Sequence, residues 1–190
     1  MRTPETEPVP LVVADADAWR AWLIAHEHDS DGVWLMLAKK GVASPTSVTY
    51  AAALEEALCS GWIDGQSKSI DDRVYRQRFT PRRARSIWSQ RNVGIVARLD
   101  AEGRLRPRGV AEIERAKADG RWDRAYAGSA TAEPPAALVA ALEGAPEARA
   151  AFAALSRSER YSALHPLLVA ATPATLERRI EKLVARLLSG

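Results

Sequence analysis

The sequence contains a single cysteine, Cys59, which excludes an intramolecular disulfide and a thiolate metal cluster and fits a reducing compartment. It also lacks an uncharged apolar run of the ~18 residues that a membrane-spanning helix needs. The first ten residues, MRTPETEPVP, are polar and interrupted by proline, unlike the apolar core of a signal peptide. From these absences we expect a cytoplasmic protein without membrane contact.

Motifs for common cofactors are absent as well. The sequence has no phosphate-binding Walker loop, no glycine-rich dinucleotide motif, no His-Glu-x-x-His and no Cys-x-x-Cys. Its histidines, His26, His28 and His165, do not have the spacing of a metal site or a catalytic triad. Cys59 likewise has no neighbouring base to activate it. We therefore expect no cofactor and no metal, and we interpret Cys59 as buried and unreactive.

The length of 190 residues and the 47% hydrophobic content suit one folded domain, which we place at residues 11–190 after a disordered tail at 1–10. The hydrophobic pattern predicts an α+β fold with a small antiparallel or mixed sheet from the N-terminal half, covered by a mostly helical C-terminal half. Strands are expected at 33–38, 62–64 and 74–79, with 65–69 as a connector. Helices are expected at about 16–26, 49–61, from Ser86 or Ser89 to Gly103, and at 107–119, 134–143, 146–155, 157–171 and 173–188.

The segment Arg73–Arg91 carries seven arginines and no acidic residue. Arginine is favoured where a planar, bidentate contact to a carboxylate or phosphate is needed. Strand alternation places Arg76 and Arg78 on one face of the predicted third strand. A helix that begins near Ser89 would add amide groups and a partial positive charge. The segment therefore predicts an anion site.

The preceding motif, Gly61–Gln66, places an indole and a carboxylate side by side, because alternate residues of a strand share a face. Asp64 is thus a candidate general acid or base, and Trp62 a candidate stacking surface. The structural alternative is a core Trp62, with Asp64 capping the next turn. In the same alternative the arginines pair with Asp64, Asp71 and Asp72 as internal clamps. The sequence leaves both interpretations open.

Four ordered motifs carry a resemblance to a known family: Gly61–Gln66, Arg78–Arg83, Ser86–Ser89 with Asn92, and Gly120–Tyr126. Together they resemble the YdeI or OmpD-associated (bacteriocin-protection) family over about residues 15–190. The resemblance implies a shared site near these motifs but no particular reaction. Relatives read Ala-Lys-Arg-Pro-Glu-Thr-Arg where this chain reads Ala170–Leu176, so all four charged residues of that motif are missing. If those charges line the site, this chain is expected to bind a different or less charged ligand.

These features lead to three functional hypotheses, and whether the chain is an enzyme stays open. The first is a ligand-binding or protective protein, of the antimicrobial-tolerance type, for a small anionic, polar or aromatic molecule. The second is a cofactor-independent hydrolase or lyase with Asp64 as general acid or base and arginines that stabilise negative charge. The third, nucleic-acid binding through Arg73–Arg91, is less favoured because acidic residues follow position 99. The predicted ligand-binding residues are Trp62, Gln66, Arg78, Thr80, Arg82, Arg83, Ser86, Trp88, Ser89, Asn92 and Trp122.

Overall fold

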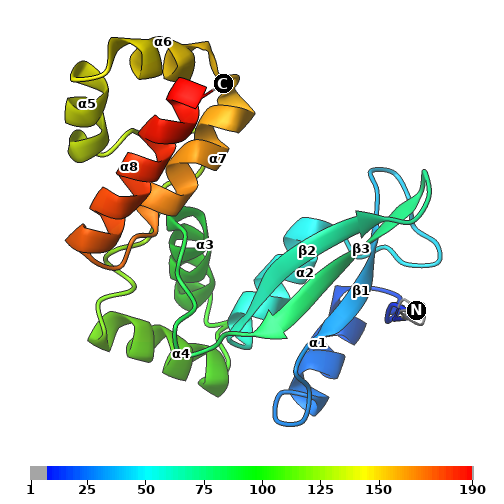
Figure 1. Cartoon of the computed structure of the whole chain (residues 1–190). Helices are drawn as coiled ribbons and strands as arrows, with labels where there is room; N and C mark the ends of the chain where they lie inside the picture. Colours follow the sequence, from blue (N-terminus) through cyan, green and yellow to red (C-terminus); the bar gives the residue numbers. More distant parts are fainter. Residues whose placement is uncertain (1–7, 190) are drawn as a thin grey trace, which may run out of the picture. The chain divides into compact units, whose positions relative to one another are not determined.

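The computed structural model describes residues 8–189 (Figure 1). Residues 1–7 of the predicted tail lie outside the described residues. Contacts divide the chain into two compact units, Met1–Ser86 with Gly94–Trp122, and Ile87–Val93 with Asp123–Gly190. The single domain at residues 11–190 stays a prediction. The α+β class is confirmed.

The first unit is built on a three-stranded antiparallel sheet in the order β1, β3, β2. Its strands are β1 (Val33–Ala38), β2 (Trp62–Ser69) and β3 (Val74–Pro81). The first strand has the predicted bounds, and its Leu35 and Leu37 are buried. Trp34 and Met36, on the opposite face, are only half-buried. The apolar run is therefore an edge strand of the sheet that packs only one of its faces into the core. Among the described residues, no further strand or helix of this unit covers its other face.

The second strand is longer than predicted, because residues 65–69 continue it beyond a bulge between Asp64 and Ser67. The bulge interrupts the ladder of backbone hydrogen bonds. The buried Gln77 compensates for this interruption, since its Nε2 donates to the carbonyl oxygens of Gly65 at 2.8 Å and Gln66 at 3.2 Å. A glutamine on the neighbouring strand thus keeps the bulged backbone paired.

Helices α1 (Ala16–Ala25) and α2 (Tyr50–Cys59) lie on the same side of the sheet (Figure 1). Both helices have a side-chain N-cap, since Asp15 accepts from the Ala18 N–H at 2.9 Å and Thr49 accepts from the Ala52 N–H at 3.3 Å. The core face of the sheet is therefore covered by helices of the N-terminal half, where the sequence pattern had assigned this role to the C-terminal helices. The core comprises Trp19, Leu23, Leu35, Leu37, Val48, Ala53, Ala57, Trp62 and Phe79.

Two more helices, α3 (Gln90–Ala101) and α4 (Pro107–Ala118), follow the sheet. The fourth helix approaches the end of α2 very closely at Gly109, where an added Cβ would lie 2.2 Å from the carbonyl oxygen of Cys59. Only glycine allows this approach, because the obstructing atom belongs to the backbone. The close contact places the residues just before α4 beside α2.

A buried carboxylate connects α2 to the neighbouring helices. The Glu56 side chain is 2% exposed and accepts hydrogen bonds from Arg20 Nε at 3.0 Å, Arg104 Nη2 at 2.9 Å and Arg106 Nη1 at 2.9 Å. Burial acts to raise the pKa of the Glu56 carboxyl, but the hydrogen bonds from these guanidinium groups outweigh it and hold that pKa below its ordinary value. Arg20, Arg104 and Arg106 therefore clamp Glu56, and all three lie outside the segment Arg73–Arg91.

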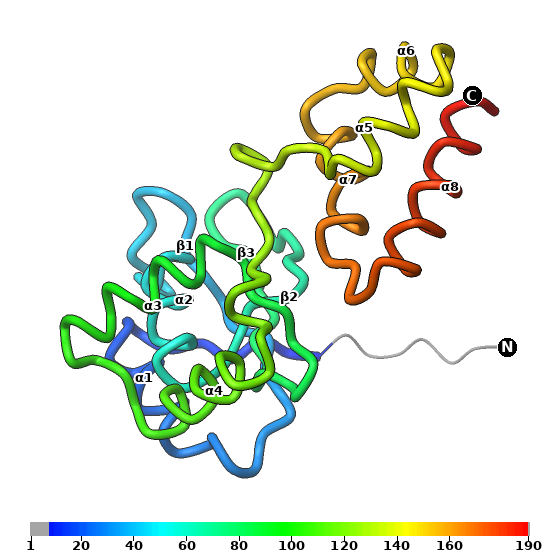
Figure 2. Tube along the Cα trace, turned by 90° about the vertical axis from the view of Figure 1, so that its left-hand side faces the viewer, coloured from blue at the N-terminus to red at the C-terminus, as the bar shows by residue number. Residues whose placement is uncertain are grey.

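The second unit is helical and contains α5 (Ala136–Glu143), α6 (Pro146–Ala154), α7 (Arg157–Leu168) and α8 (Pro173–Ser189), drawn from yellow to red in Figure 2. These bounds lie close to the predicted ones. The seventh helix begins with a capping box between Ser156 and Glu159. The apolar faces enclose a core of Leu138, Leu142, Ala148, Phe152, Ala163, Leu164, Leu167, Ile180 and Leu183. No helix within residues 8–189 is long and apolar enough to cross a membrane.

Candidate functional site

The first two sequence motifs meet at the end of the β2–β3 hairpin. The backbone N–H of Arg82 donates to the Gly61 carbonyl at 3.0 Å. Arg83 and Ser86 then close a turn, in which the Arg83 N–H donates to Ser86 Oγ and the Ser86 N–H donates to the Arg83 carbonyl, both at 2.9 Å. The buried Arg121, from the fourth motif, donates to the Ser86 carbonyl at 2.8 Å. Part of what these motifs do is therefore to hold backbone segments together.

The remaining motif residues make a similar connection within the second unit. Tyr126 donates its N–H to the Trp88 carbonyl at 3.0 Å, and its own carbonyl accepts from the Gln90 N–H at 2.9 Å. Between them, Ser89 caps α3 as predicted, because its Oγ accepts from the Asn92 N–H at 3.2 Å. The third and fourth motifs thus pair as two short extended segments at the start of a helix.

Four of the predicted ligand-binding side chains are buried: Trp62 (0% exposed), Trp88 (1%), Arg82 (5%) and Asn92 (8%). Trp62 packs edge-on against Trp22 at a centroid distance of 5.9 Å. A ligand could stack on Trp62 only by displacing a core side chain, so its burial favours the structural alternative for this residue. Trp62 and Trp88 fall in different units, and their convergence on one hollow stays a prediction.

The candidate acid or base, Asp64, is half-buried and accepts a hydrogen bond from the Tyr50 hydroxyl at 2.8 Å. It shares the core-side face with Trp62, as strand alternation predicted, and it connects β2 to α2. Asp71 caps its own turn by accepting from the N–H groups of Arg73 and Val74, both at 2.8 Å. Neither carboxylate is paired with Arg78 or Arg83 in the described structure. The alternative in which acids neutralise the arginines therefore finds no support at Arg78 or Arg83, and it stays a hypothesis for the other arginines of the segment.

The opposite face of the sheet carries cations and an aromatic ring. In the strand register Trp34 lies directly across from Arg78, and Arg76 and Thr80 follow on the same face. The Arg76 guanidinium lies over the Trp34 ring at 4.9 Å and donates to the Pro8 carbonyl at 3.1 Å. No carboxylate of the three strands shares this face, because Asp64 points to the other side. We call Trp34, Arg76, Arg78 and Thr80 the sheet-face site.

A glycine packs closely against one corner of the sheet-face site. Gly32 has φ of 127°, a conformation that L side chains rarely adopt. A Cβ at this position would lie 2.6 Å from the Phe79 carbonyl oxygen, 2.6 Å from Thr80 Cγ2 and 3.0 Å from Arg78 Nη2. Only glycine therefore allows this close approach to Arg78, whose half-buried guanidinium has no hydrogen-bond or ion-pair partner among residues 8–189.

The other predicted residues are distributed around the first unit. Gln66 and Arg83 are exposed, and Ser86 is half-buried in its turn. Trp122 lines a separate pocket of about 270 Å³ between α3 and α4, where Lys117 Nζ lies 5.8 Å from its ring centre. In the described part of the chain no group of three or more His, Cys, Asp and Glu side chains could hold a metal ion.

Sequence reasoning missed Trp34 and Gly32 as site residues. Strand alternation alone places Trp34 on the face of the first strand opposite to Leu35. The sequence pattern did not show that this strand pairs with β3 or in which register, so it did not bring Trp34 and Arg78 together. Cys59, in contrast, is fully buried as predicted, and burial raises the pKa of its thiol.

By its fold the protein is an α+β protein in which one unit has a sheet with a cationic face and the other unit is helical. Comparisons with protein families divide the chain in a similar way. Residues 11–112, more than half of the chain, match the family described as Domain of unknown function (DUF8412), and the chain belongs to that family. Residues 131–190 match the family described as Bacteriocin-protection, YdeI or OmpD-Associated, which confirms the resemblance predicted from the sequence. No curated protein and no solved structure matches the chain.

The two matches refine where the resemblance lies. The four motifs that suggested it extend from Gly61 to Tyr126, whereas the bacteriocin-protection match begins at residue 131. That match covers α5, α6, α7 and α8 and includes the altered segment Ala170–Leu176. The sheet-face site lies within the other family's match. The match to the bacteriocin-protection family is compatible with a protective or tolerance-type role.

Proposed function

We propose that this protein binds a small aromatic anion at the sheet-face site and that this binding serves a protective, tolerance-type role. The observation that carries the proposal is the half-buried Arg78 guanidinium, which has no carboxylate partner in the described structure and lies across the strand from Trp34. A partly desolvated guanidinium without a counter-charge favours an anion, because burial weakens its hydration.

The neighbouring groups narrow the ligand class. The Trp34 ring, already covered in part by Arg76, offers an aromatic surface on which a flat ligand could stack. The Thr80 hydroxyl beside Arg78 could donate to or accept from a polar substituent. Lys68, opposite Arg76 on β2, adds a further cation to the same face. A ring bearing one or two negative charges matches this set better than a neutral or cationic molecule.

Phenyl phosphate, inorganic phosphate and benzyl alcohol would test the two requirements separately. The full chain is titrated with each compound, and binding is followed by the indole N–H signal of Trp34 in NMR spectra. Phenyl phosphate is expected to bind best, since inorganic phosphate lacks the ring and benzyl alcohol lacks the charge. Its affinity should fall as salt is added, because the contact is electrostatic.

Arg78→Gln is expected to weaken phenyl phosphate binding about tenfold or more, in line with a charge-assisted hydrogen bond. Trp34→Leu should reduce the advantage of phenyl phosphate over inorganic phosphate. Arg85→Gln is the matched control, because Arg85 is an exposed arginine of the same segment that lies outside the sheet. Equal affinities in wild type, Arg78→Gln and Arg85→Gln would remove the sheet-face site from consideration.

The other two hypotheses stay predictions with distinct results in these assays. Turnover by wild type, abolished in Asp64→Asn with binding retained, would favour the hydrolase or lyase hypothesis. Preference for a single-stranded oligonucleotide over phenyl phosphate, with a steep salt dependence, would favour nucleic-acid binding by the same cationic face.

A further inference from the structure

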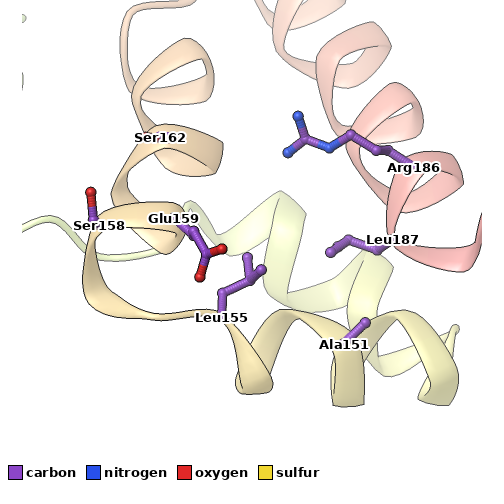
Figure 3. A pocket seen from close by; sticks show the side chains of 7 residues that line it. All are labelled: Ala151, Leu155, Ser158, Glu159, Ser162, Arg186 and Leu187. Atoms are coloured by element: carbon purple, nitrogen blue, oxygen red, sulfur yellow. The ribbon is translucent and has the colours of Figure 1, made fainter. Parts of the chain in front are cut away.

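The second unit contains a pocket that is unrelated to the sheet-face site. Its volume is about 530 Å³, within the range of about 300–1,000 Å³ that is typical of small-molecule sites. The walls come from the end of α6, the first turns of α7 and the last turns of α8 (Figure 3). The lining residues are Ala151, Leu155, Ser158, Glu159, Ser162, Arg186 and Leu187.

Opposite charges stand on opposite walls of this pocket. Figure 3 shows the Glu159 carboxylate extending from α7 and the Arg186 guanidinium extending from α8, with Leu155 and Leu187 between them. Neither charge has an ion-pair partner among the described residues. The two are thus held apart over an apolar surface, where each could be neutralised by a ligand.

The local structure keeps Glu159 in place and ionised. Its carboxylate accepts a hydrogen bond from the Ser156 N–H at 2.9 Å in the capping box of α7. Hydrogen bonds from Ser156 hold the pKa of the Glu159 carboxyl below its ordinary value. Ser156 therefore fixes the Glu159 carboxylate at the start of α7, on the wall of the pocket.

An adjoining pocket of about 430 Å³ shares Ser162 and Arg186 with the first pocket and adds further cationic residues near Arg186. Its wall includes Lys182 and Arg179, which stand on the same side of α8 as Arg186 because they precede it by four and seven residues. Arg179 donates to the Pro166 carbonyl, whereas Lys182 has no ion-pair partner among the described residues. The Arg186 end of the site is therefore cationic and the Glu159 end anionic.

We infer that this pocket binds a short zwitterionic peptide with apolar side chains, its carboxylate at Arg186 and its ammonium group at Glu159. The apolar side chains would lie on Leu155, Leu187 and Ala151, which form the floor. A di- or tripeptide fills a pocket of about 530 Å³ better than a single amino acid does. This inference does not rest on the proposed function of the sheet-face site.

The experiment uses the full chain and calorimetric titration with leucyl-leucine, its N-acetyl derivative and its C-terminal amide. Leucyl-leucine is expected to bind, and removing either charge should weaken binding by about tenfold, the size of one charge-assisted contact. Free leucine should bind more weakly than the dipeptide, because it has one apolar side chain fewer to bury.

Variants assign each charge to its partner. Glu159→Gln keeps a capping-box side chain, because glutamine also accepts from the N-cap N–H. It should weaken leucyl-leucine about tenfold but leave binding of the N-acetyl derivative unchanged. Arg186→Gln should also weaken leucyl-leucine about tenfold but leave binding of the C-terminal amide unchanged. Arg178→Gln, on α8 but not in the pocket lining, is the matched control and should bind as wild type does.

Three results would overturn the inference. The first is no binding of leucyl-leucine at millimolar concentration to a wild-type chain whose helical circular dichroism is intact. The second is equal binding of leucyl-leucine, its N-acetyl derivative and its amide, which would reduce the site to an apolar surface. The third is unchanged affinity in both Glu159→Gln and Arg186→Gln. None of these results depends on phenyl phosphate binding, so failure here is distinguishable from failure of the proposed function.

Discussion

Replacing Glu56 by glutamine tests whether the buried carboxylate holds α1, α2 and the start of α4 together. The substitution preserves the shape of the side chain but removes the charge that three guanidinium groups share. Losing one partner of a buried ion pair costs about 3–5 kcal/mol, because the remaining charge is left uncompensated. Arg106 is 15% exposed, but Arg104 and Arg20 are 33% and 44% exposed, so water can hydrate two of the three after the change.

We therefore expect a loss near the lower end, about 3 kcal/mol. A loss of that size lowers the melting temperature of a chain of this length by about 6–12 °C. Thermal denaturation followed by circular dichroism measures the shift. Glu55→Gln is the matched control, because the neighbouring Glu55 is paired with Arg98 and Arg104 but is 24% exposed. Its loss should stay below about 1 kcal/mol, as is usual for exposed ion pairs.

The same residue predicts a pH dependence. The pKa of Glu56 in the folded chain lies below its ordinary value of 4.5, so the unfolded chain binds the proton first as the pH falls. The contribution of Glu56 to stability is complete above about pH 4.5 and is lost as the pH falls through the folded pKa. The difference in stability between wild type and Glu56→Gln should narrow in that acidic range. A shift for Glu56→Gln no larger than that for Glu55→Gln, or a difference independent of pH, would refute this reasoning.

Four further predictions concern packing, thiol access and cooperativity. Gly109→Ala should unfold or strongly destabilise the chain in thermal denaturation, since its Cβ would meet the Cys59 carbonyl oxygen at 2.2 Å. Gly94→Ala, which has open space around it in α3, should instead stabilise the chain by about 0.5–1 kcal/mol. The Cys59 thiol should react with a thiol reagent at pH 7 only after unfolding in guanidinium, because burial raises its pKa and blocks access; rapid reaction of the native chain would contradict its placement. Phe152→Ala should cost about 3–5 kcal/mol by opening a cavity in the core of the second unit, as measured by circular dichroism. If the chain is one cooperative domain, tryptophan fluorescence, which reports mainly on the first unit, should shift together with the circular dichroism signal.

Several elements were predictable because their signals are local. The helices capped by Asp15, Thr49 and Ser89 each follow a short polar side chain, and the pattern predicted their starts at about 16, at about 49 and at Ser86 or Ser89. The apolar run at 33–38 has strand length and flanking turn residues, which were sufficient for its bounds. The alternation of β3 also placed Arg76 and Arg78 on one face correctly. Each of these conclusions needs only neighbouring residues.

The residues of the candidate site were harder to predict from the sequence. The tryptophans of the quoted motifs attracted attention by their flanking glycines and arginines, yet Trp62 lies in the core. Trp34 lies in a plain apolar run and joins Arg78 only through the pairing of β1 with β3. Residues 65–69 resembled a connector because glycine and small polar residues are typical of turns, but Gln77 on the neighbouring strand stabilises the bulge that keeps them in the sheet.

The sequence by itself determined the positions of nearly all helices and strands, the lack of a second cysteine for an intramolecular disulfide, and the arginine concentration before α3. It did so because periodicity, caps and composition are properties of short segments. Only the tertiary structure decided which arginines are neutralised. Arg104 and Arg106 meet Glu56 across about fifty residues of chain, while Arg78 meets no described carboxylate. The pairing of charges depends on which segments are brought together in space, and a local pattern does not contain that information.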